Sequence, residues 1–474
     1  MTHLRVSPTP GADAPPSDRA TLSIRNPWTG AVVGEVPCAT RSEVVAAIDA
    51  ATAAAPAAAA LPSHARAALL GRIADGVERD REALVELLVA ESGKPRRIAA
   101  SEVDRTVFVF RQASEEATRI GGEVLPMDLA PHGEGRLALT RRFPMAPIAA
   151  ITPFNFPLLL AAHKLAPAIA CGATVVLKPP PQDPLSTLKL AEILAEAGVP
   201  DGMVAVVPCT TEDAAPLLDD PRIRMISFTG SAQVGWMIRS RARHARVALE
   251  LGGNAAVIIG PDADLEHAVA RCVQGGYAYA GQSCISTQRI LVHAARHAEF
   301  VERFTEGVAG LRCGDPADPA TDVGPLIDEA SAVRAIGRIE EAVAAGARVA
   351  TGGRREGAMV LPTVLLDTTS AMRVNCEEVF APVTTVRAFG TLEEALGIVN
   401  DSAFGLQMGL FTNDLRWVMT AFERADVGAV VVNDVAGFRV DHLPYGGVKQ
   451  SGLGREGVRS AIEGMTELRM LMLG

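Results

Sequence analysis

The chain has 474 residues, more than one hydrophobic core usually supports, so we expect two large domains and a smaller accessory element. Apolar residues make up 48% and charged residues 21%, as in ordinary globular proteins. The formal net charge of −10 argues against nucleic acid or an anionic membrane as a partner, because both bind clustered Lys and Arg.

Residues 1–20 are rich in Pro, Ala and polar residues and lack the apolar core of a signal peptide, which predicts a disordered tail. From about residue 40 to 120, apolar side chains recur at three- and four-residue steps, which predicts amphipathic helices, with Gly93 near the end of one. The segment 122–142 has alternating character and predicts an excursion hairpin.

From residue 143 to 251, short apolar strands alternate with helices: PIAAITP, TVVLKPP, MVAVVPC, MISFTG and RVALELGG are strands, and stretches such as EDAAPLLDD between them are helical. This alternation predicts an α/β fold with a doubly wound parallel sheet, in which nucleotides bind at the carboxyl ends of the strands. We therefore assign 21–121 and 143–251 to a dinucleotide-binding domain. The stretch from Met145 to Leu177 is apolar, but four prolines and the pair His163–Lys164 exclude a membrane span.

A second α/β unit follows at 252–440 and is expected to be the catalytic domain, with strands such as RILVH, RVATGG and TTVRAF. The C-terminal segment 441–474 carries a Gly-rich loop, a helix and a final strand that is apolar on both faces. Such a strand favours pairing with another subunit. We expect it to form a small β oligomerisation element with the 122–142 segment.

The cysteines are seven, an odd number, and widely spaced, and none lies in a CxxC or Cys/His metal pattern. In a chain of this length, this pattern indicates a reduced, cytoplasmic protein in which one thiol can be catalytic, and no metal site. They are Cys38, Cys171, Cys209, Cys272, Cys284, Cys313 and Cys376.

Cys284 lies in AGQSCIST, in the middle of the second unit. A buried structural thiol is one interpretation, since free cysteine is among the most buried residue types. The small and polar neighbours Gly281, Ser283 and Ser286 favour an accessible turn instead. A thiolate in such a turn can add to a carbonyl carbon, so Cys284 is a candidate nucleophile.

Glu250 ends an apolar strand in VALELGGN, where a carboxylate is costly unless it is paired or neutralised. It either forms a salt bridge or a backbone hydrogen bond at the turn, or has a raised pKa that suits a general base. Asn155 lies between Pro153 and Pro157 in TPFNFP. Asn is common in turns for its backbone hydrogen bonds, but a fixed side-chain amide can also donate to a developing oxyanion.

Gly230 and Gly235 lie across a strand-to-helix turn in FTGSAQVG. This GxxxxG pattern is weaker than the GxGxxG dinucleotide motif, but its context suits a phosphate at a helix N-terminus. Lys178 ends the strand TVVLK, where it either reaches a ribose or phosphate or is solvated.

Six motifs occur in an order and at a spacing that resemble the aldehyde dehydrogenase superfamily: TPFNFP, VLKPP, FTGS, LELGGN, GQSC and EEVFAPV. The resemblance covers residues ~22 to 474, and six motifs in register are far more specific than any one. It implies NAD(P)-dependent oxidation of an aldehyde to a carboxylic acid through a thioester on Cys284, by a homodimer or homotetramer. It also implies that Asn155 and the backbone N–H of Cys284 form the oxyanion hole, and that Glu250 activates the water for hydrolysis.

The presence of Glu250 favours hydrolysis over transfer of the acyl group to CoA. Two alternatives are a CoA-acylating semialdehyde dehydrogenase and a non-catalytic, crystallin-like relative, which should have lost the Cys, Glu or Asn.

In NAD-preferring relatives, a Glu that binds the adenosine 2′-hydroxyl commonly stands where this chain has Pro181, so we expect NADP to be accepted as well as NAD. The expected cofactor-binding residues are Thr152, Pro153, Phe154, Lys178, Pro181, Gly230, Ser231, Gly235, Leu251, Glu378 and Phe380.

Relatives that oxidise phosphorylated or phosphonate aldehydes resemble this chain in carrying an Arg near Arg105 and another near Arg439. This favours a small aldehyde with an anionic far end: a semialdehyde, a phosphono- or sulfoacetaldehyde, or a phosphorylated aldehyde. A neutral aldehyde such as lactaldehyde is the alternative, in which Arg105 pairs with a neighbouring Asp or Glu and Arg439 braces its loop. Ser283 stands where several of those relatives have a further Arg.

Overall fold

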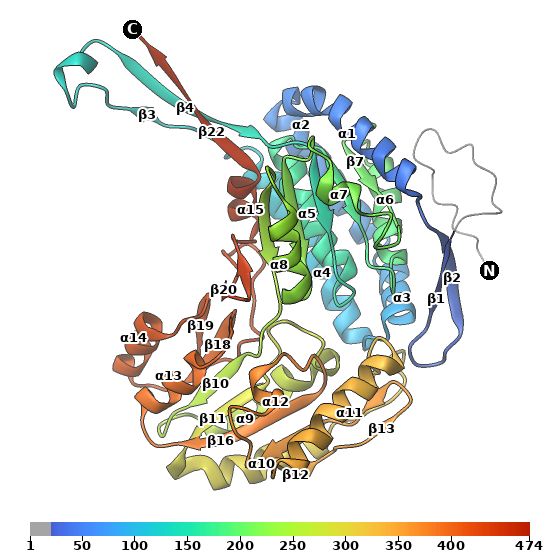
Figure 1. Cartoon of the computed structure of the whole chain (residues 1–474), viewed down its shortest axis with the longest axis vertical. Coiled ribbons are helices and arrows are strands. Elements are labelled where there is room, and N and C mark those ends of the chain that lie inside the picture. The colour runs from blue at the N-terminus through green and yellow to red at the C-terminus, as the bar shows by residue number, and fades with distance from the viewer. Residues whose placement is uncertain (1–19) are drawn as a thin grey trace.

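The computed structural model describes residues 20–474, so the predicted tail, residues 1–20, lies outside the described residues except for Ala20. Two sheets, each covered by helices, form the body of the molecule, and a narrow β arm projects from it (Figure 1). The chain enters the body through the antiparallel hairpin of β1 (Thr21–Arg25) and β2 (Val32–Pro37). The predicted α/β class is confirmed.

The first sheet, within the described residues, has the strand order β21-β9-β8-β5-β6-β7 and is parallel except for β21. Alternate residues of its central strand enter two different cores, Ile148 and Ala150 on one face and Ala149 on the other. Both faces are therefore covered, as parallel sheets require. The strands are β5 (Ile148–Ile151), β6 (Val175–Lys178), β7 (Val204–Val206), β8 (Met225–Thr229), β9 (Arg246–Glu250) and β21 (Gly452–Leu453).

The helices of this half come from the N-terminal region, from the crossovers between the strands and from the C-terminal segment. Gly93 ends α3 in the left-handed conformation, as predicted. The helices are α1 (Arg41–Ala60), α2 (Ser63–Arg79), α3 (Arg81–Ser92), α4 (Arg96–Glu116), α5 (Pro157–Cys171), α6 (Leu185–Glu196), α7 (Pro216–Asp219), α8 (Ala232–Arg241) and α15 (Val458–Gly464).

The prediction of a crossover helix over EDAAPLLDD is wrong in extent, because α7 has four residues, Pro216–Asp219. Residues 211–215 form turns, and Pro216 occupies the first helical position, where its missing N–H costs no helical hydrogen bond. The helix ends at Asp220, whose carboxylate accepts a hydrogen bond from the backbone of Arg222.

The second sheet, also within residues 20–474, has the order β12-β15-β16-β11-β10-β18-β19, with β12 antiparallel to β15. Val257 and Ile259 enter one core and Ala256 and Ile258 the other, so this sheet too is covered on both faces. Its strands are β10 (Ala256–Ile259), β11 (Arg289–His293), β12 (Arg348–Thr351), β15 (Thr363–Leu366), β16 (Val383–Phe389), β18 (Gln407–Phe411) and β19 (Ala429–Val432). Its helices are α9 (Leu265–Tyr277), α10 (His297–Ala309), α11 (Glu329–Ala344), α12 (Arg373–Cys376), α13 (Leu392–Asn400) and α14 (Leu415–Arg424).

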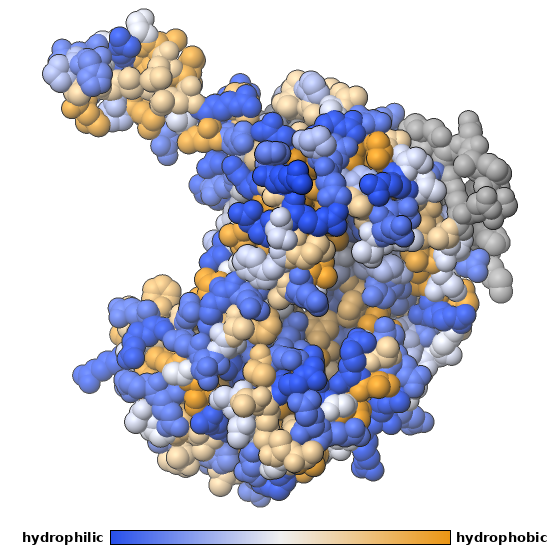
Figure 2. All heavy atoms as spheres, viewed as in Figure 1, coloured by the Kyte–Doolittle hydropathy of each residue, from blue (hydrophilic) through white to orange (hydrophobic). Residues whose placement is uncertain are grey.

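The arm is an antiparallel sheet of β3 (Val124–Leu125), β4 (Leu137–Pro144) and β22 (Thr466–Leu473), in the order β22-β4-β3. The excursion hairpin and the apolar terminal strand thus pair with each other in register from Thr466↔Pro144 to Leu473↔Leu137. Apolar side chains remain exposed along it, and Figure 2 shows them beside polar ones on the projecting part. The rest of the 441–474 segment belongs to the body, because β21 joins the first sheet and α15 packs on α5.

One helix within the described residues, α1, is long and apolar enough to cross a membrane by length and composition. Its Val44, Ala47, Ile48 and Ala51 are buried, and the helix packs on β6 and β7. A helix on the face of a sheet passes the same test, so this is weak evidence for a span.

Candidate active site

A cavity of about 660 Å³ lies between the two sheets and is lined by residues from both. Asn155 follows β5, Glu250 ends β9, and Cys284 precedes β11. These three predicted residues line the same cavity, and so do the two arginines predicted at the substrate end, Arg105 and Arg439. The first sheet contributes the carboxyl ends of its strands, where ligands bind in parallel α/β folds, and the second sheet contributes residues that precede its strands.

An unusual backbone turn positions Cys284. After α9, the residues Tyr279, Ala280 and Gly281 have φ values of 49°, 52° and 71°, in the left-handed region that costs energy for residues with a Cβ. At Gly281, a Cβ would lie 2.2 Å from the Ala381 carbonyl oxygen, so glycine is required there. This turn brings the partly exposed Cys284 to the cavity, as the predicted accessible turn requires.

The Cys284 thiol lies 3.0 Å from the Tyr445 hydroxyl. Burial raises the pKa of Cys284 to about 11, while the hydrogen bond from Tyr445 acts in the opposite direction. The Glu378 carboxylate raises this pKa further and the Arg439 guanidinium lowers it. Cys284 is therefore mainly a thiol at neutral pH, and the amount of thiolate depends on the charges around it.

Glu250 is 6% exposed, and its Oε2 atom is buried without a hydrogen-bond partner among the described residues. Burial, and then the neighbouring Glu456 carboxylate, raise the pKa of Glu250 well above its usual range. The sequence left open whether Glu250 forms a salt bridge or a backbone hydrogen bond at the turn. Its Oε2 atom forms neither within the described residues. Its raised pKa suits a general base that takes a proton from water.

Asn155 is held through its backbone, which leaves its side chain available. The backbone oxygen of Asn155 accepts a hydrogen bond of 2.9 Å from Lys94 Nζ, and Lys94 forms a buried ion pair with Glu102. Glu102 in turn accepts hydrogen bonds from the first backbone N–H groups of α5, at Leu158 and Leu159. The Asn155 side-chain oxygen is buried and unpaired within the described chain, so this amide has no structural partner there to compete with a ligand.

The turn between β8 and α8 has the features of a phosphate site. Ser231 caps α8 by accepting a hydrogen bond from the Val234 N–H, and the other N–H groups of the first turn point out of the helix end. At Gly235, a Cβ would lie 2.4 Å from Leu251 Cδ2, so glycine lets α8 approach the end of β9. At Gly230, a Cβ would lie 2.6 Å from the Phe228 ring.

The remaining predicted cofactor residues lie around the same strand ends. Thr152 follows β5, and its N–H donates to the carbonyl of Lys178, which ends β6. Lys178 is buried, which lowers its pKa, and Pro181 is exposed beyond it. Pro153 and Phe154 follow Thr152 and line the cavity.

Glu378 and Phe380 lie in the loop between α12 and β16 and contact Gly253 and Phe154. Glu378 accepts a hydrogen bond of 3.0 Å from the Gly253 N–H, and burial raises its pKa to about 7. A Cβ at Gly252 would lie 2.2 Å from Glu378 Oε2. Phe380 meets Phe154 edge to face, with the ring centres 5.8 Å apart. The helix N-terminus at Ser231 and the buried carboxylate of Glu378 line one cavity and fit a dinucleotide, whereas Lys178 lies at the end of β6 outside that lining.

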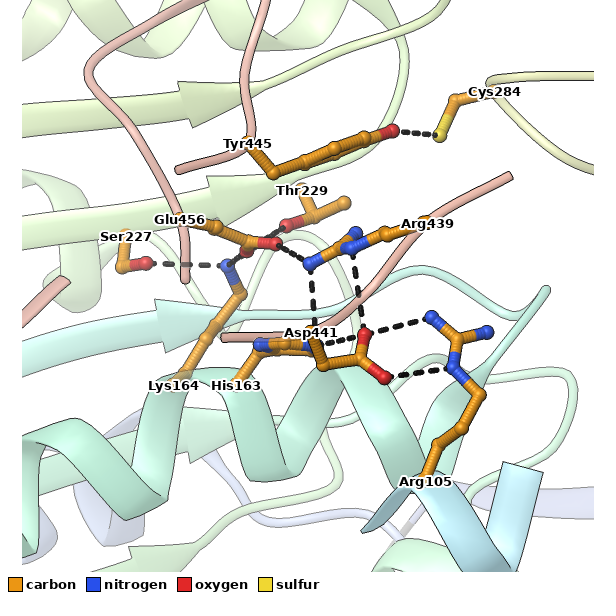
Figure 3. A network of polar contacts seen from close by, with 10 residues as sticks. All are labelled: Arg105, His163, Lys164, Ser227, Thr229, Cys284, Arg439, Asp441, Tyr445 and Glu456. Carbon is orange, nitrogen blue, oxygen red and sulfur yellow. Dashed lines mark hydrogen bonds and ion pairs between the residues drawn. The ribbon is translucent and has the colours of Figure 1, made fainter. Parts of the chain in front are cut away.

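A buried network of charges, missed by the sequence reasoning, lies behind these groups (Figure 3). Lys164 Nζ donates to Ser227 and Thr229 and lies 3.5 Å from Glu456. Arg439 lies 3.2 Å from Glu456. A signal was present, because His163 and Lys164 interrupt α5, whose other residues are apolar and whose fifteen residues are all buried.

Arg105 does not pair with a neighbouring acid along α4. Asp104 pairs with Arg81 instead, and Arg105 makes two hydrogen bonds, of 2.8 and 2.7 Å, to Asp441. Arg439 lies 3.4 Å from the same carboxylate and stacks 3.7 Å from the centre of the Tyr445 ring. Asp441 therefore joins the two arginines that the sequence placed at the substrate end.

Comparison with known proteins agrees with this geometry. The model of the aldehyde dehydrogenase family matches residues 15–471. A 3-sulfolactaldehyde dehydrogenase of Priestia aryabhattai is 42% identical over 95% of this chain and 94% of its own length.

Solved structures of similar proteins have the same fold. Aldehyde dehydrogenase 21 from Physcomitrella patens, in complex with the reaction product succinate, matches with a TM-score of 0.95 and 41% identity, covering 96% of this chain and 95% of its own. Glyceraldehyde-3-phosphate dehydrogenase from Methanocaldococcus jannaschii, complexed with NADP, matches with a TM-score of 0.92 and 36% identity, covering 96% and 99%.

Proposed function

Since this chain belongs to the aldehyde dehydrogenase family and oxidises aldehydes with NAD or NADP, we propose that its substrate is a small aldehyde with an anionic far end. The observation that carries this proposal is that the groups proposed to react and two arginines line the same cavity. Cys284, Glu250 and Asn155 line it together with Arg105 and Arg439.

In the proposed reaction, the Cys284 sulfur adds as a thiolate to the aldehyde carbon. The side-chain amide of Asn155 and the backbone N–H of Cys284 donate hydrogen bonds to the oxygen, where negative charge develops. Bound NAD(P)⁺ supplies the acceptor for the hydride that leaves this carbon. The acyl group then remains on Cys284 as a thioester, and Glu250 takes a proton from the water that hydrolyses it.

The proposed cofactor contacts follow from the strand ends. The N-terminus of α8, with Ser231 at its cap, would bind a phosphate, because its free N–H groups carry partial positive charge. Lys178 would reach the adenosine ribose or its phosphate. Glu378 and Phe380 would hold the nicotinamide-side ribose, since they close the cleft from the second sheet.

The two alternative functions differ in their products. A CoA-acylating enzyme would release an acyl-CoA, whereas hydrolysis through Glu250 releases the acid. A non-catalytic relative would release neither, and the retention of Cys284, Glu250 and Asn155 in one cavity argues against it.

The proposal of an anionic substrate also rests on the edge of the Arg105 guanidinium that Asp441 does not occupy. Asp441 binds the Nε and Nη2 atoms of Arg105, and Nη1 has no hydrogen-bond partner among the residues that the structure describes. Two of the similar proteins are named for an anionic aldehyde or were solved with a dicarboxylate product. A neutral aldehyde such as lactaldehyde is the second candidate, because both arginines have acidic partners in the structure.

We further propose that the protein is a cytoplasmic homo-oligomer, a dimer or a tetramer. The arm carries side chains such as Leu468, Met470 and Met472 that are 54–57% exposed, which a second copy would cover. All seven cysteines are free, which fits a reducing compartment.

Sedimentation velocity should give a multiple of the 49.6 kDa chain mass, and a monomer would contradict the proposal. Fractionation of cells should recover the activity in the cytoplasmic fraction, and recovery elsewhere would refute the location.

Glu250→Gln should spare acylation and stall hydrolysis, because Gln cannot take a proton from water. We expect a burst of about one reduced cofactor per active site, followed by slow turnover, in stopped-flow absorbance. Cys284→Ala is the matched control and should show no burst, with turnover below about a hundredth of wild type and unchanged dinucleotide binding. An unchanged steady-state rate of the Gln variant would show that Glu250 is not the base.

Arg105→Met and Arg439→Met should each lower kcat/KM for succinic semialdehyde at least about tenfold more than for butanal, because a guanidinium contributes to binding a charged end but not an apolar one. Arg111→Met is the matched control, since Arg111 lies on the same helix, is half exposed and pairs with Asp75 and Glu78. Arg111→Met should leave kcat/KM unchanged for both substrates. Equal losses for both substrates would show that Arg105 and Arg439 are structural.

The enzyme should accept NADP as well as NAD, with kcat/KM values within about a thousandfold, or roughly 4 kcal/mol. No carboxylate stands at Pro181 to repel a 2′-phosphate, and Lys178 lies nearby in the chain. Pro181→Glu should lower kcat/KM for NADP at least about tenfold and leave NAD little changed. A wild-type preference for NAD above a thousandfold would contradict this account.

A further inference from the structure

We propose that Asp441 sets the charge at the substrate end of the cavity, so that the enzyme prefers an aldehyde with one negative charge, a carboxylate or a sulfonate, over a doubly charged phosphate or phosphonate. This inference rests on the proposed anionic substrate and narrows it to one charge class. Asp441 acts through the arginines that line the cavity, and is therefore a specificity-determining, positioning residue.

Asp441 is buried behind the cavity, with three groups directed at its carboxylate (Figure 3). Arg105 binds both of its oxygens, His163 Nε2 lies 3.0 Å from Oδ1, and Arg439 Nε lies 3.4 Å from the same oxygen. Burial disfavours the charged form, but hydrogen bonds from Arg105 and His163 hold the pKa of Asp441 well below its usual range. It is therefore a permanent negative charge beside both guanidinium groups.

The pairing also fixes the direction of Arg105. Asp441 occupies the edge formed by Nε and Nη2, so the guanidinium plane is fixed and the edge formed by Nη1 and Nη2 remains for a ligand. Arg105 is 31% exposed in its side chain and lines the cavity, whereas Arg439 is 8% exposed and engaged on both sides. One guanidinium edge is thus presented to the substrate, which suits one anionic group.

The connected network of ion pairs around Asp441 holds one more cation than carboxylates (Figure 3). Burial, and then the nearby Arg439, lower the pKa of His163, so it adds no charge at neutral pH. Glu250 and Glu378 line the same cavity, but within the described residues neither forms an ion pair with the cations of this network. Its cations are Arg105, Arg439 and Lys164, and the carboxylates that pair with them are Asp441 and Glu456.

Because the network has only one surplus cation, its affinity for an anion depends on how many negative charges the anion carries. A carboxylate or sulfonate carries one negative charge at neutral pH and neutralises the site. A phosphate monoester carries a net charge of about −1.5 to −2 at pH 7. The second charge would have no cation to pair with and would face Asp441 and Glu456 across a low-dielectric cavity, where like charges repel strongly.

The wild-type enzyme gives the first test with two substrates of the same skeleton, sulfoacetaldehyde and phosphonoacetaldehyde. At about pH 8.5, kcat/KM for the sulfonate should exceed that for the phosphonate at least about tenfold, because the phosphonate then carries nearly two charges. Lowering the pH to about 6 should bring the two values together, since the phosphonate gains a proton and the sulfonate does not. A ratio that does not change with pH, or a preference for the phosphonate at high pH, would overturn the proposal.

Asp441→Asn gives the second test, because it adds one positive charge and keeps an oxygen that accepts from Arg105. The ratio of sulfonate to phosphonate kcat/KM at about pH 8.5 should fall at least about tenfold, through a lower KM for the phosphonate. Asp441→Glu should restore the wild-type ratio even where kcat falls, because it keeps the charge. Asp104→Asn is the matched control: it removes the same charge beside Arg105 in the sequence, but Asp104 is 58% exposed and pairs with Arg81.

A ratio that Asp441→Asn leaves unchanged, or that Asp104→Asn shifts equally, would overturn the proposal. This failure is distinct from failure of the proposed function. If the Met variants of Arg105 and Arg439 affect charged and uncharged aldehydes equally, the anionic substrate class itself is wrong. If they discriminate but Asp441→Asn does not change the ratio, the substrate class stands and the charge-setting role of Asp441 is wrong.

Discussion

Arg439 is buried between two carboxylates, Glu456 and Asp441, with its guanidinium over the Tyr445 ring. Removing one partner of a buried ion pair leaves an uncompensated charge, at a cost of about 3–5 kcal/mol. The reacting groups depend on these pairs, because Tyr445 contacts the Cys284 thiol and Glu456 raises the pKa of Glu250. The same buried charges thus lie beside the proposed nucleophile and the proposed base and extend to Asp441, which binds Arg105.

The fold explains why this network can be assembled. The carboxyl ends of β5 and β9 and the amino end of β11 face one cavity, so residues from both sheets meet there. The C-terminal segment then crosses the cleft, pairs with β9 through β21 and supplies Asp441, Tyr445 and Glu456. Strain is concentrated next to the chemistry, in the left-handed residues before Cys284, where the surrounding packing has to maintain it.

The sequence predicted what is local. Short apolar strands alternating with helices indicated the two parallel sheets, and the motifs around Cys284, Glu250 and Asn155 indicated residues that the structure brings to one cavity. The ion pairs could not be predicted in this way, because Arg105 and Asp441 are 336 residues apart and His163 and Asp441 are 278 apart. The pair His163–Lys164 was a usable signal: two polar residues inside a fully buried helix require partners, and here those partners are Asp441, Glu456 and Arg439.

The central claim is that the acyl group is carried on Cys284, and mass spectrometry of the quenched enzyme tests it most directly. Glu250→Gln, mixed with substrate and cofactor and quenched in acid, should gain one acyl group per chain, on the peptide that contains Cys284. The chain has seven cysteines, so the peptide assignment is decisive. An unmodified chain during turnover, or an acyl group on any other cysteine, would contradict the account.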